Sequence, residues 1–287
     1  MQKVGFIGLG TMGFPIAGHI SQSYKTLVFN RTINKAQKWT SQFEGEICES
    51  IKDLTSKSNV ILLCLSEDKD IEEIVLGKGG ILEYLKEGTI VVDHSTTSTN
   101  LATTVSKHLL KKKSFYLDAP VSGGEAGAQN GTLSVMIGGD EVAYKDISSI
   151  LDCYSSFYKY MGPSGNGQLT KMINQICIAG LVQGLSEAMA FGKKAKLDME
   201  KVLQVISKGA AQSWQMENRY KTMLKGEYEF GFAVDWMRKD LSICFNEAEK
   251  NGASLPITKI IDKYYKEIQK NGGSRYDTSS LMTLVDD

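Results

Sequence analysis

Three glycines near the start of the chain have a spacing that suits phosphate binding. Gly8, Gly10 and Gly13 follow an apolar run at residues 3–8 and precede a segment with helical periodicity. In such a turn the first glycine lets the chain reverse, the second lets the backbone approach a pyrophosphate, and the third lets helix pack on strand. The helix N-terminus then faces the anion. The spacing predicts a dinucleotide-binding turn, with a purely structural turn as the alternative.

The residues that end the second predicted strand bear on which dinucleotide binds. Asn30, Arg31 and Thr32 follow a strand predicted over residues 26–29. An acidic residue there would hydrogen-bond the ribose 2′-hydroxyl of NAD, whereas these three carry no negative charge to repel a 2′-phosphate. The Arg31 guanidinium could also pair with that phosphate. We predict NADP(H) as the preferred cofactor and NAD(H) as a possible one; the alternative is that Arg31 is only a solvated surface residue.

The composition is that of an ordinary globular protein. The chain has 287 residues, enough for two domains, and 42% of them are hydrophobic. Lys+Arg and Asp+Glu both total 33, so no basic excess favours nucleic acid. We identify no signal peptide ahead of the first strand and no apolar run of membrane-spanning length. We therefore expect a cytoplasmic protein that binds a small molecule, with neither nucleic acid nor membrane as a partner.

Cysteine and histidine follow no disulfide or metal-site pattern. The five cysteines lie far apart without a C-x-x-C pair, so we expect them to be reduced. His19, His94 and His108 fall on separate predicted elements, without the spacing of a metal site. We assign no metal, and we expect each histidine to be structural.

The first half of the chain alternates between apolar strands and helices. Continuous apolar runs such as residues 59–65 are typical of strands buried on both faces of a parallel sheet. This alternation predicts an α/β Rossmann domain with a mostly parallel, doubly wound sheet. Further strands are predicted at 89–93, 115–117, 133–137 and 157–161, and helices at 34–43, 71–76, 100–112 and 142–153.

Two polar clusters follow predicted strands, where ligands bind in open α/β sheets. Ser95 and Thr96 follow the strand at 89–93 and either bind the cofactor or belong to a hydroxyl cluster that only caps the next helix. Ser122, Gly123 and Gly124 follow the strand at 115–117 and could present hydroxyl and N–H groups to a carboxylate. This second cluster favours a small anionic substrate, with a plain turn as the alternative.

Beyond Gly167 the pattern becomes helical throughout. The helix predicted over 168–196 carries apolar residues on nearly every face, which indicates a buried helix. Lys171, Asn174 and Gln175 interrupt it on one side, one turn apart, either in a structural ion pair or facing a cleft. We place the Rossmann domain at 1–163 and an all-helical domain at 164–287. Its other predicted helices are 199–208, 241–250 and 257–270.

With these stretches in view, the chain resembles the β-hydroxyacid dehydrogenase family. This family includes 3-hydroxyisobutyrate dehydrogenase, tartronate semialdehyde reductase and the glyoxylate/succinic semialdehyde reductases. The resemblance covers essentially the whole chain. Four stretches carry it in the family's order: residues 8–17, 118–124 (DAPVSGG), 165–174 (GNGQLTKMIN) and 239–241 (KDL).

The resemblance implies a role for individual residues. Ser122, Gly123 and Gly124 would hold the substrate carboxylate, and Lys171 would be catalytic. Asn174 would orient the substrate, but some relatives have a second asparagine where this chain has Gln175, which leaves the amide open between the two. Asp240 would also lie at the substrate, and Lys239 would reach the cofactor or close the cleft. The residues expected to bind the cofactor are Gly8, Leu9, Gly10, Thr11, Met12, Gly13, Asn30, Arg31, Thr32, Leu65, Thr96 and Lys239.

The resemblance also implies an activity and an assembly. The expected reaction is NADPH-dependent reduction of a small aldehyde or 2-oxo acid, of the glyoxylate or succinic semialdehyde class, to a hydroxy acid. One alternative is an NAD-dependent dehydrogenase of the 3-hydroxyisobutyrate type. Another is a non-catalytic cofactor-binding interaction module, whose expected mark would be a missing lysine at position 171. The family further implies a Rossmann domain joined by one long helix to a helical domain that forms a homodimer or homotetramer.

Overall fold

The structure is a computed structural model that describes residues 3–286. It separates into two compact units, Met1–Lys171 and Met172–Asp287, so the division falls inside the long helix α10, Asn166–Lys194. The predicted boundary at 163/164 lies slightly earlier, between the last strand and this helix. The outermost residues of the predicted domains, 1, 2 and 287, lie outside the described part of the chain.

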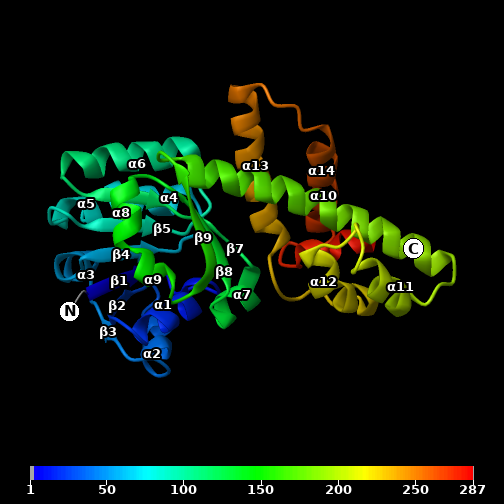
Figure 1. Ribbon diagram of the computed structural model, residues 1–287, viewed down its shortest axis with the longest axis horizontal. Helices are drawn as coiled ribbons and strands as arrows, with labels where there is room; N and C mark the ends of the chain where they lie inside the picture. Colours follow the sequence, from blue (N-terminus) through cyan, green and yellow to red (C-terminus); the bar gives the residue numbers. More distant parts are fainter. Residues whose placement is uncertain (1–2, 287) are drawn as a thin grey trace. The chain divides into compact units, whose positions relative to one another are not determined.

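The first unit is organised around one mostly parallel sheet, as predicted (Figure 1). Its strand order is β3-β2-β1-β4-β5-β6-β8-β7, with β9 paired to β8. The chain moves from β1 to β2 on one side and to β4 on the other, so the topological switch point lies at the carboxyl end of β1. The strands are β1 Lys3–Ile7, β2 Lys25–Phe29, β3 Glu46–Ile47, β4 Val60–Leu63, β5 Ile90–Asp93, β6 Phe115–Asp118, β7 Val121–Ser122, β8 Leu133–Gly138 and β9 Ser155–Gly162.

Helices cover both faces of this sheet, because alternate strand residues point to opposite sides. On β1, Val4 and Phe6 join a core with α1 and α2, whereas Ile7 joins a second core with α3 and α6. Figure 1 accordingly shows α1 and α6 on opposite sides of the central strands. The helices are α1 Gly13–Ser21, α2 Ile33–Thr40, α3 Ile51–Lys57, α4 Asp68–Ile71, α5 Ile81–Tyr84, α6 Thr99–Lys111, α7 Gly124–Asn130, α8 Glu141–Asp146 and α9 Ser148–Leu151.

Two predicted helices of this unit differ from the structure. The helix expected at 142–153 is divided at Ile147 into α8 and α9. The helix expected at 71–76 is a single α turn, α4, followed by a π-helical turn at Glu72–Leu76. Apolar spacing alone does not distinguish such irregular turns from a continuous helix.

The second unit consists of helices, as predicted. After α10 these are α11 Met199–Ile206, α12 Trp214–Lys225, α13 Val234–Asn251, α14 Pro256–Lys270 and a 3-10 segment, η2 Thr278–Leu284. Its apolar side chains form two clusters, one around Val182, Met237 and Tyr265 and the other around Met189 and Met216. Across residues 3–286, none of the helices has both the length and the apolar character needed to cross a membrane.

Helix α13 begins earlier than predicted. It starts at Val234, so Lys239 and Asp240 lie inside the helix rather than ahead of a helix at 241–250. The start was missed because Ala233 stands at the N-cap, where a polar capping residue would normally mark a boundary. Helix α12 was not predicted either, although Ser213 caps it by accepting a hydrogen bond from the Met216 N–H.

The prediction that α10 is buried on nearly every face is wrong for the single chain. One stripe of the helix is exposed, including Ile173 at 63% and Phe191 at 76%. The stripe also carries Cys177 and two glycines, Gly180 and Gly184, next to which an added side chain would meet nothing within 4 Å.

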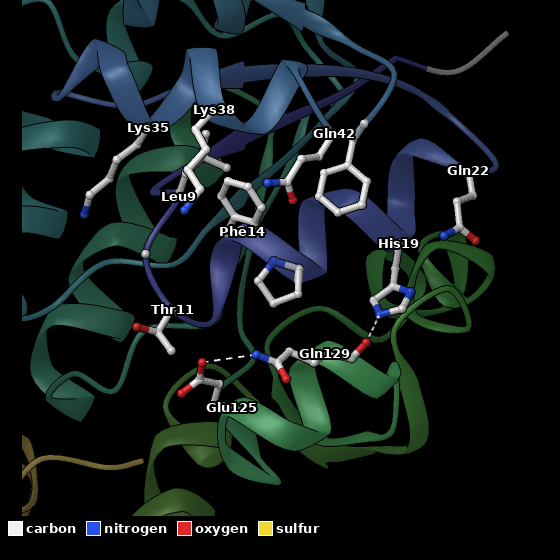
Figure 2. A pocket seen from close by; sticks show the side chains of 13 residues that line it. Leu9, Thr11, Phe14, His19, Gln22, Lys35, Lys38, Gln42, Glu125 and Gln129 are labelled. Carbon is white, nitrogen blue, oxygen red and sulfur yellow. Dashed lines mark hydrogen bonds between the residues drawn. The ribbon is translucent and has the colours of Figure 1, made fainter. Parts of the chain in front are cut away.

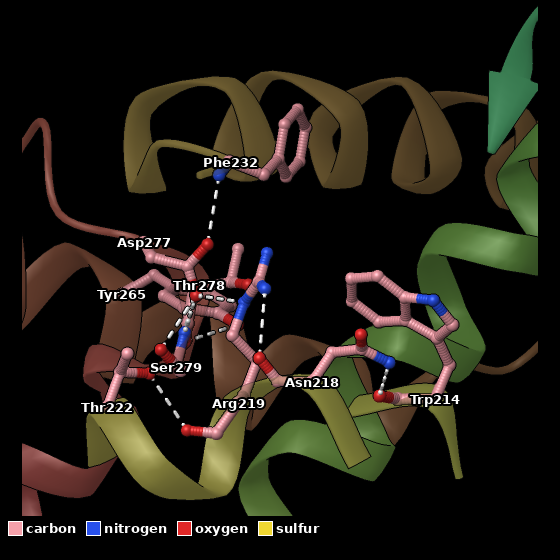
Figure 3. A network of polar contacts seen from close by, with 9 residues as sticks. All are labelled: Trp214, Asn218, Arg219, Thr222, Phe232, Tyr265, Asp277, Thr278 and Ser279. Atoms are coloured by element: carbon pink, nitrogen blue, oxygen red, sulfur yellow. Dashed lines mark hydrogen bonds and ion pairs between the residues drawn. The ribbon is translucent and has the colours of Figure 1, made fainter. Parts of the chain in front are cut away.

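A buried ion pair connects separate segments of the second unit (Figure 3). The Arg219 Nε of α12 donates to Asp277 Oδ1 at 3.0 Å, and the Asp277 carboxylate is fully buried. Asp277 also accepts hydrogen bonds from the Phe232 N–H and from the N–H and hydroxyl of Ser279. The guanidinium lies 5.0 Å from the Trp214 ring, so the start of α12 packs on the same arginine. Nothing in the sequence pattern pointed to this network.

Candidate active site

The glycine turn lies at the switch point of the sheet, between β1 and α1. Gly8 has a φ of +100°, a conformation that favours glycine, and a side chain on Gly13 would come within 2.0 Å of the Gly8 carbonyl oxygen. A side chain on Gly10 would instead meet nothing within 4 Å. Folding therefore requires glycine at positions 8 and 13. At position 10 the fold has room for a side chain, and glycine there leaves the backbone accessible to a ligand. This open backbone at a helix start fits the pyrophosphate of a dinucleotide.

Asn30 connects this turn to the second strand. Its Oδ1 accepts a hydrogen bond from the Leu9 N–H at 2.9 Å, and its Nδ2 donates to the Thr32 carbonyl at 3.0 Å. Arg31 and Thr32 are exposed beside it. The amide of Asn30 thus holds the turn, while the neighbouring cation extends into solvent where a ligand could meet it.

A pocket of about 590 Å³ opens beside the glycine turn (Figure 2). Gly10 and Thr11 line it at one end, and Lys35 and Lys38 line it from α2. In Figure 2 both lysine side chains point from α2 toward the side of the pocket where Thr11 lies. Sequence reasoning missed both lysines. Lys38 follows Lys35 by three residues within the helix predicted after Arg31, a helical spacing that could have marked a second cationic position.

The residues after β4 and β5 are joined by buried hydrogen bonds. Ser95 Oγ accepts from the Leu65 N–H at 2.8 Å, and the Ser95 N–H donates to Asp93 Oδ1 at 2.9 Å. Burial raises the pKa of Asp93 to about 6, although hydrogen bonds from Ser95 and from Tyr116 oppose that shift. Helix α6 is capped by Ser98, whose Oγ accepts from the Leu101 N–H. Ser95 therefore holds the loop after β4 instead of capping the helix.

His94 is fully enclosed within the first unit. Its Nδ1 lies 2.6 Å from the Ala119 carbonyl oxygen, which can only accept, so Nε2 accepts from the Tyr154 hydroxyl at 2.9 Å. Burial lowers the pKa of His94 to about 4, so the ring is neutral near pH 7. Both hydrogen bonds join His94 to buried residues of its own unit, so His94 has the structural role that was expected. Among the described residues, no group of three or more His, Cys, Asp or Glu side chains is placed to hold a metal ion.

The serine–diglycine loop follows β7. Gly123 has a φ of +130° and Gly124 a φ of +63°, so the chain takes two consecutive conformations that favour glycine. Helix α7 begins at Gly124, and a side chain added there would meet nothing within 4 Å. Ser122 precedes this turn at the end of β7. The loop therefore has an open backbone next to a hydroxyl, which suits a carboxylate.

Lys171 lies beside this loop within the same unit. The side chain is buried, with 8% exposed, and its Nζ donates to the Val121 carbonyl oxygen at 2.9 Å. Val121 directly precedes Ser122, so the structure brings the lysine and the serine–diglycine loop together although 50 residues separate them. Sequence spacing left open whether Lys171 forms a structural ion pair. In the structure its Nζ donates to a neutral backbone carbonyl of the residue next to Ser122.

Two hydrogen bonds and an ion pair join four predicted residues in the second unit. Asn174 Nδ2 donates to Gln175 Oε1 at 2.7 Å, and Gln175 Nε2 donates to Asp240 Oδ2 at 2.6 Å. The Lys239 Nζ lies 2.9 Å from the other Asp240 oxygen. Gln175 and Asp240 are buried, whereas Asn174 is only half-buried. The buried pair thus supports the more exposed amide.

A glycine turn at the switch point of a doubly wound sheet is typical of nicotinamide-dependent oxidoreductases. Two family models place the chain in this class. The NAD binding domain of 6-phosphogluconate dehydrogenase matches residues 3–162, and the NAD-binding domain of NADP-dependent 3-hydroxyisobutyrate dehydrogenase matches residues 165–285. The chain belongs to the β-hydroxyacid dehydrogenase family, as its motifs predicted. It is an NAD(P)-dependent oxidoreductase that acts on CH–OH groups.

Individual relatives extend over nearly the whole chain. An uncharacterized oxidoreductase of Shewanella frigidimarina is 50% identical, covering 100% of this chain and 99% of the relative. The 2-hydroxy-3-oxopropionate reductase of Escherichia coli is 31% identical, covering 99% and 97%. The solved structure of Psf3 in complex with NADP+ and 2-OPP has a TM-score of 0.90 at 25% identity, covering 98% of this chain and 99% of that one.

Proposed function

We propose that the protein reduces a small aldehyde or 2-oxo acid, of the glyoxylate or succinic semialdehyde class, to the hydroxy acid with NADPH. The observation that carries this proposal is the hydrogen bond of 2.9 Å from Lys171 Nζ to the Val121 carbonyl, directly before the serine–diglycine loop. It sets a proton donor next to a carboxylate-binding backbone. The name of the E. coli relative supports the substrate class, because 2-hydroxy-3-oxopropionate carries both an aldehyde and a carboxylate.

The chain's own residues would act on the two ends of such a substrate. The loop at Ser122, Gly123 and Gly124 binds the carboxylate through its hydroxyl and open backbone. Lys171 donates a proton to the carbonyl oxygen as negative charge develops there. A nicotinamide cofactor held at the glycine turn supplies the hydride when bound. Since the ammonium is buried, water competes little with the substrate oxygen for its protons.

The preference for NADPH is proposed from the cations around the glycine turn. Arg31 is exposed after β2, and Lys35 and Lys38 line the adjoining pocket. Three cations can stabilise a 2′-phosphate, and no acidic residue stands where NAD-binding domains hydrogen-bond the 2′-hydroxyl. The NADP+ complex of Psf3 supports the same choice.

Asn174 is proposed as the amide that orients the substrate. It lies three residues after Lys171 on α10, on the same side of the helix and one turn away. Gln175 is already engaged by Asn174 and by the buried Asp240. Asp240 therefore acts through Gln175 rather than by touching substrate, and Lys239 neutralises its charge.

A homo-oligomer is proposed from the exposed stripe of α10. Ile173 and Phe191 are mostly exposed on this stripe, and the two glycines between them leave the helix backbone accessible to another helix. Glycine inside a helix costs about 1 kcal/mol relative to alanine, so its use here favours close packing with a second copy. Sedimentation of Ile173→Glu and Phe191→Glu would test this: we expect a shift to monomer, and an unchanged mass would contradict the proposal.

The direct test of the reaction is a substrate panel. Purified protein would be offered glyoxylate, succinic semialdehyde and related aldehyde and 2-oxo acids, with NADPH and NADH consumption recorded in parallel. We expect NADPH oxidation with at least one short acid and little with the corresponding uncharged aldehydes, which lack the carboxylate. Oxidation of 3-hydroxy acids with NAD+ alone would favour a 3-hydroxyisobutyrate-type dehydrogenase instead.

A further inference from the structure

Asp118 caps the start of the helix that carries Lys171. Asp118 ends β6 and is fully buried. Its Oδ1 accepts a hydrogen bond from the Gly165 N–H at 2.8 Å, and its Oδ2 accepts from the Gln168 N–H at 3.0 Å. The first N–H groups of a helix have no partner within the helix, so a carboxylate from elsewhere in the chain stabilises them. Asp118 therefore fastens the first turn of α10 to the end of a central strand.

The backbone around this cap is packed without spare room. A side chain on Gly167 would come within 2.2 Å of the Asp118 carbonyl oxygen, and one on Gly138 within 2.7 Å of Asp118 Oδ1. The helix start thus lies directly against β6 and β8. A displacement of α10 along its axis would require these contacts to break.

Gln168 joins the same helix turn to the loop after β5. Its side chain is fully buried. Its Oε1 accepts from the Thr97 N–H at 3.0 Å, and its Nε2 donates to the Ser95 carbonyl at 2.8 Å. The Ser95 hydroxyl in turn accepts a hydrogen bond from the Leu65 N–H. One glutamine therefore connects α10 with the loops after β5 and β4, at the sheet edge where ligands bind in this fold.

These contacts act on Lys171, which follows Gln168 by three residues, about one turn later on α10. We propose that Asp118 and Gln168 are positioning residues that fix Lys171 relative to the loops on the cofactor side of the sheet. This inference rests on the proposed role of Lys171 as proton donor. A displacement of about 1 Å in a reacting group can cost roughly 10²-fold in rate, so fastening the helix start at two points is a means of keeping the donor in place.

The test uses near-isosteric variants that change hydrogen bonding at each point. In Asp118→Asn, one acceptor oxygen becomes an N–H group that opposes a helix N–H. In Gln168→Glu, the group facing the Ser95 carbonyl becomes an oxygen that repels it. Asp140→Asn is the matched control, because Asp140 caps a different helix, α8, through the Val142 and Ala143 N–H groups. Gln168→Met removes both side-chain bonds without adding charge, and it keeps the test decisive if Asp118→Asn does not fold.

The expected result is a fall in kcat of about tenfold or more for the Asp118 and Gln168 variants, with NADPH affinity within about twofold of wild type. The control should keep its kcat. In a Lys171→Ala background the same variants should cost little further, because their effect passes through the lysine. The positioning role would be overturned if these variants lowered kcat by the same factor in the Lys171→Ala background as in wild type. It would also be overturned if they weakened NADPH affinity as much as they lowered kcat.

The two proposals fail in different ways. If Lys171→Ala alone keeps normal turnover, the proton donor is wrong, and the positioning role is lost with it. If Lys171→Ala loses turnover while the Gln168 variants keep it, only the positioning role is wrong. Unfolding temperatures of every variant would separate these results from simple destabilisation.

Discussion

The side chain of Asn30 accepts a hydrogen bond from the Leu9 N–H at 2.9 Å, so the residue that directly follows β2 also fixes the turn that follows β1. This relationship separates two functions in one short segment. Asn30 supports the shape of the turn, whereas its exposed neighbour Arg31 is placed to contact a ligand. Substitutions at these adjacent positions should therefore have different consequences.

Arg31→Ala and Lys35→Ala should each lower kcat/KM for NADPH about tenfold while changing kcat/KM for NADH much less, because each removes a cation available to the 2′-phosphate. Asn30→Asp should lower kcat/KM for NADPH through repulsion of the 2′-phosphate and should also weaken the turn, because a carboxylate oxygen would replace the N–H that donates to the Thr32 carbonyl. Steady-state rates with both cofactors would measure this, with the exposed Lys111→Ala as control. An unchanged ratio of kcat/KM for NADPH and NADH in Arg31→Ala and Lys35→Ala would contradict recognition of the 2′-phosphate by these two cations.

Lys171→Ala should reduce kcat by roughly 10²-fold or more, since it removes the proposed proton donor. Affinity for NADPH should change little, because the glycine turn lies elsewhere in the unit. Lys171→Arg should not restore turnover: a guanidinium is larger, planar and always protonated. Fluorescence titration of NADPH and turnover with the preferred acid would be measured on the same preparations. Near-normal turnover by folded Lys171→Ala would eliminate the donor.

The elements that depend on local pattern could be predicted from the sequence. Apolar runs located the parallel strands, and the spacing of Gly8, Gly10 and Gly13 located the turn between β1 and α1. Contacts between distant segments could not be predicted this way. Gln168 and Ser95 are 73 residues apart, and nothing in either neighbourhood specifies the other. Pairing of Lys171 with Val121 likewise becomes visible only when the sheet is folded.

Asn174→Ala should mainly affect catalysis, whereas Gln175→Ala should mainly affect stability. Asn174 is half-buried, so its loss should lower kcat/KM for the acid with little change in stability. Gln175 is buried and donates to Asp240, so its loss should reduce the free energy of unfolding by about 1 to 3 kcal/mol. Urea unfolding and steady-state kinetics of both variants would show which amide acts on the substrate and which stabilises the fold. If Gln175→Ala proves stable but inactive, the substrate amide belongs to Gln175 instead.

Arg219→Ala should destabilise the protein by about 3 to 5 kcal/mol, because it leaves the buried Asp277 carboxylate without its cation. The exposed pair of Lys145 with Glu141 on α8 offers a comparison: Lys145→Ala should destabilise the protein far less, because water screens this pair. Chemical unfolding at neutral pH would measure both. Equal and small losses would show that the Asp277 network in Figure 3 contributes little to stability.

The buried His94 should make stability depend on pH in a defined window. Its pKa is lowered to about 4 in the folded protein, against an ordinary value of about 6.5, so between these values the unfolded chain binds more protons. The free energy of unfolding contributed by His94 therefore falls as pH drops from about 6.5 to 4, by on the order of 3 kcal/mol in total.

Two buried carboxyls work in the opposite direction. Burial raises the pKa of Asp93 and of Asp118 to about 6, so between roughly pH 4 and 6 the folded protein binds more protons than the unfolded chain at these sites. Their contribution to the free energy of unfolding rises as pH falls. The two carboxyls therefore oppose the loss of stability that the protonation of His94 alone would cause as pH falls through this window.

Replacing His94 should expose the contribution of the carboxyls. His94→Asn can still donate to the Ala119 carbonyl but cannot take up a proton near these pH values, so its free energy of unfolding should decrease less than that of wild type, or increase, as pH falls from 6.5 to 4. Tyr154→Phe is the matched control, since it removes the hydroxyl that His94 accepts from but leaves the imidazole buried and titrating. Urea unfolding at several pH values would give the slopes. Parallel slopes for wild type and His94→Asn would show that His94 does not set the pH dependence.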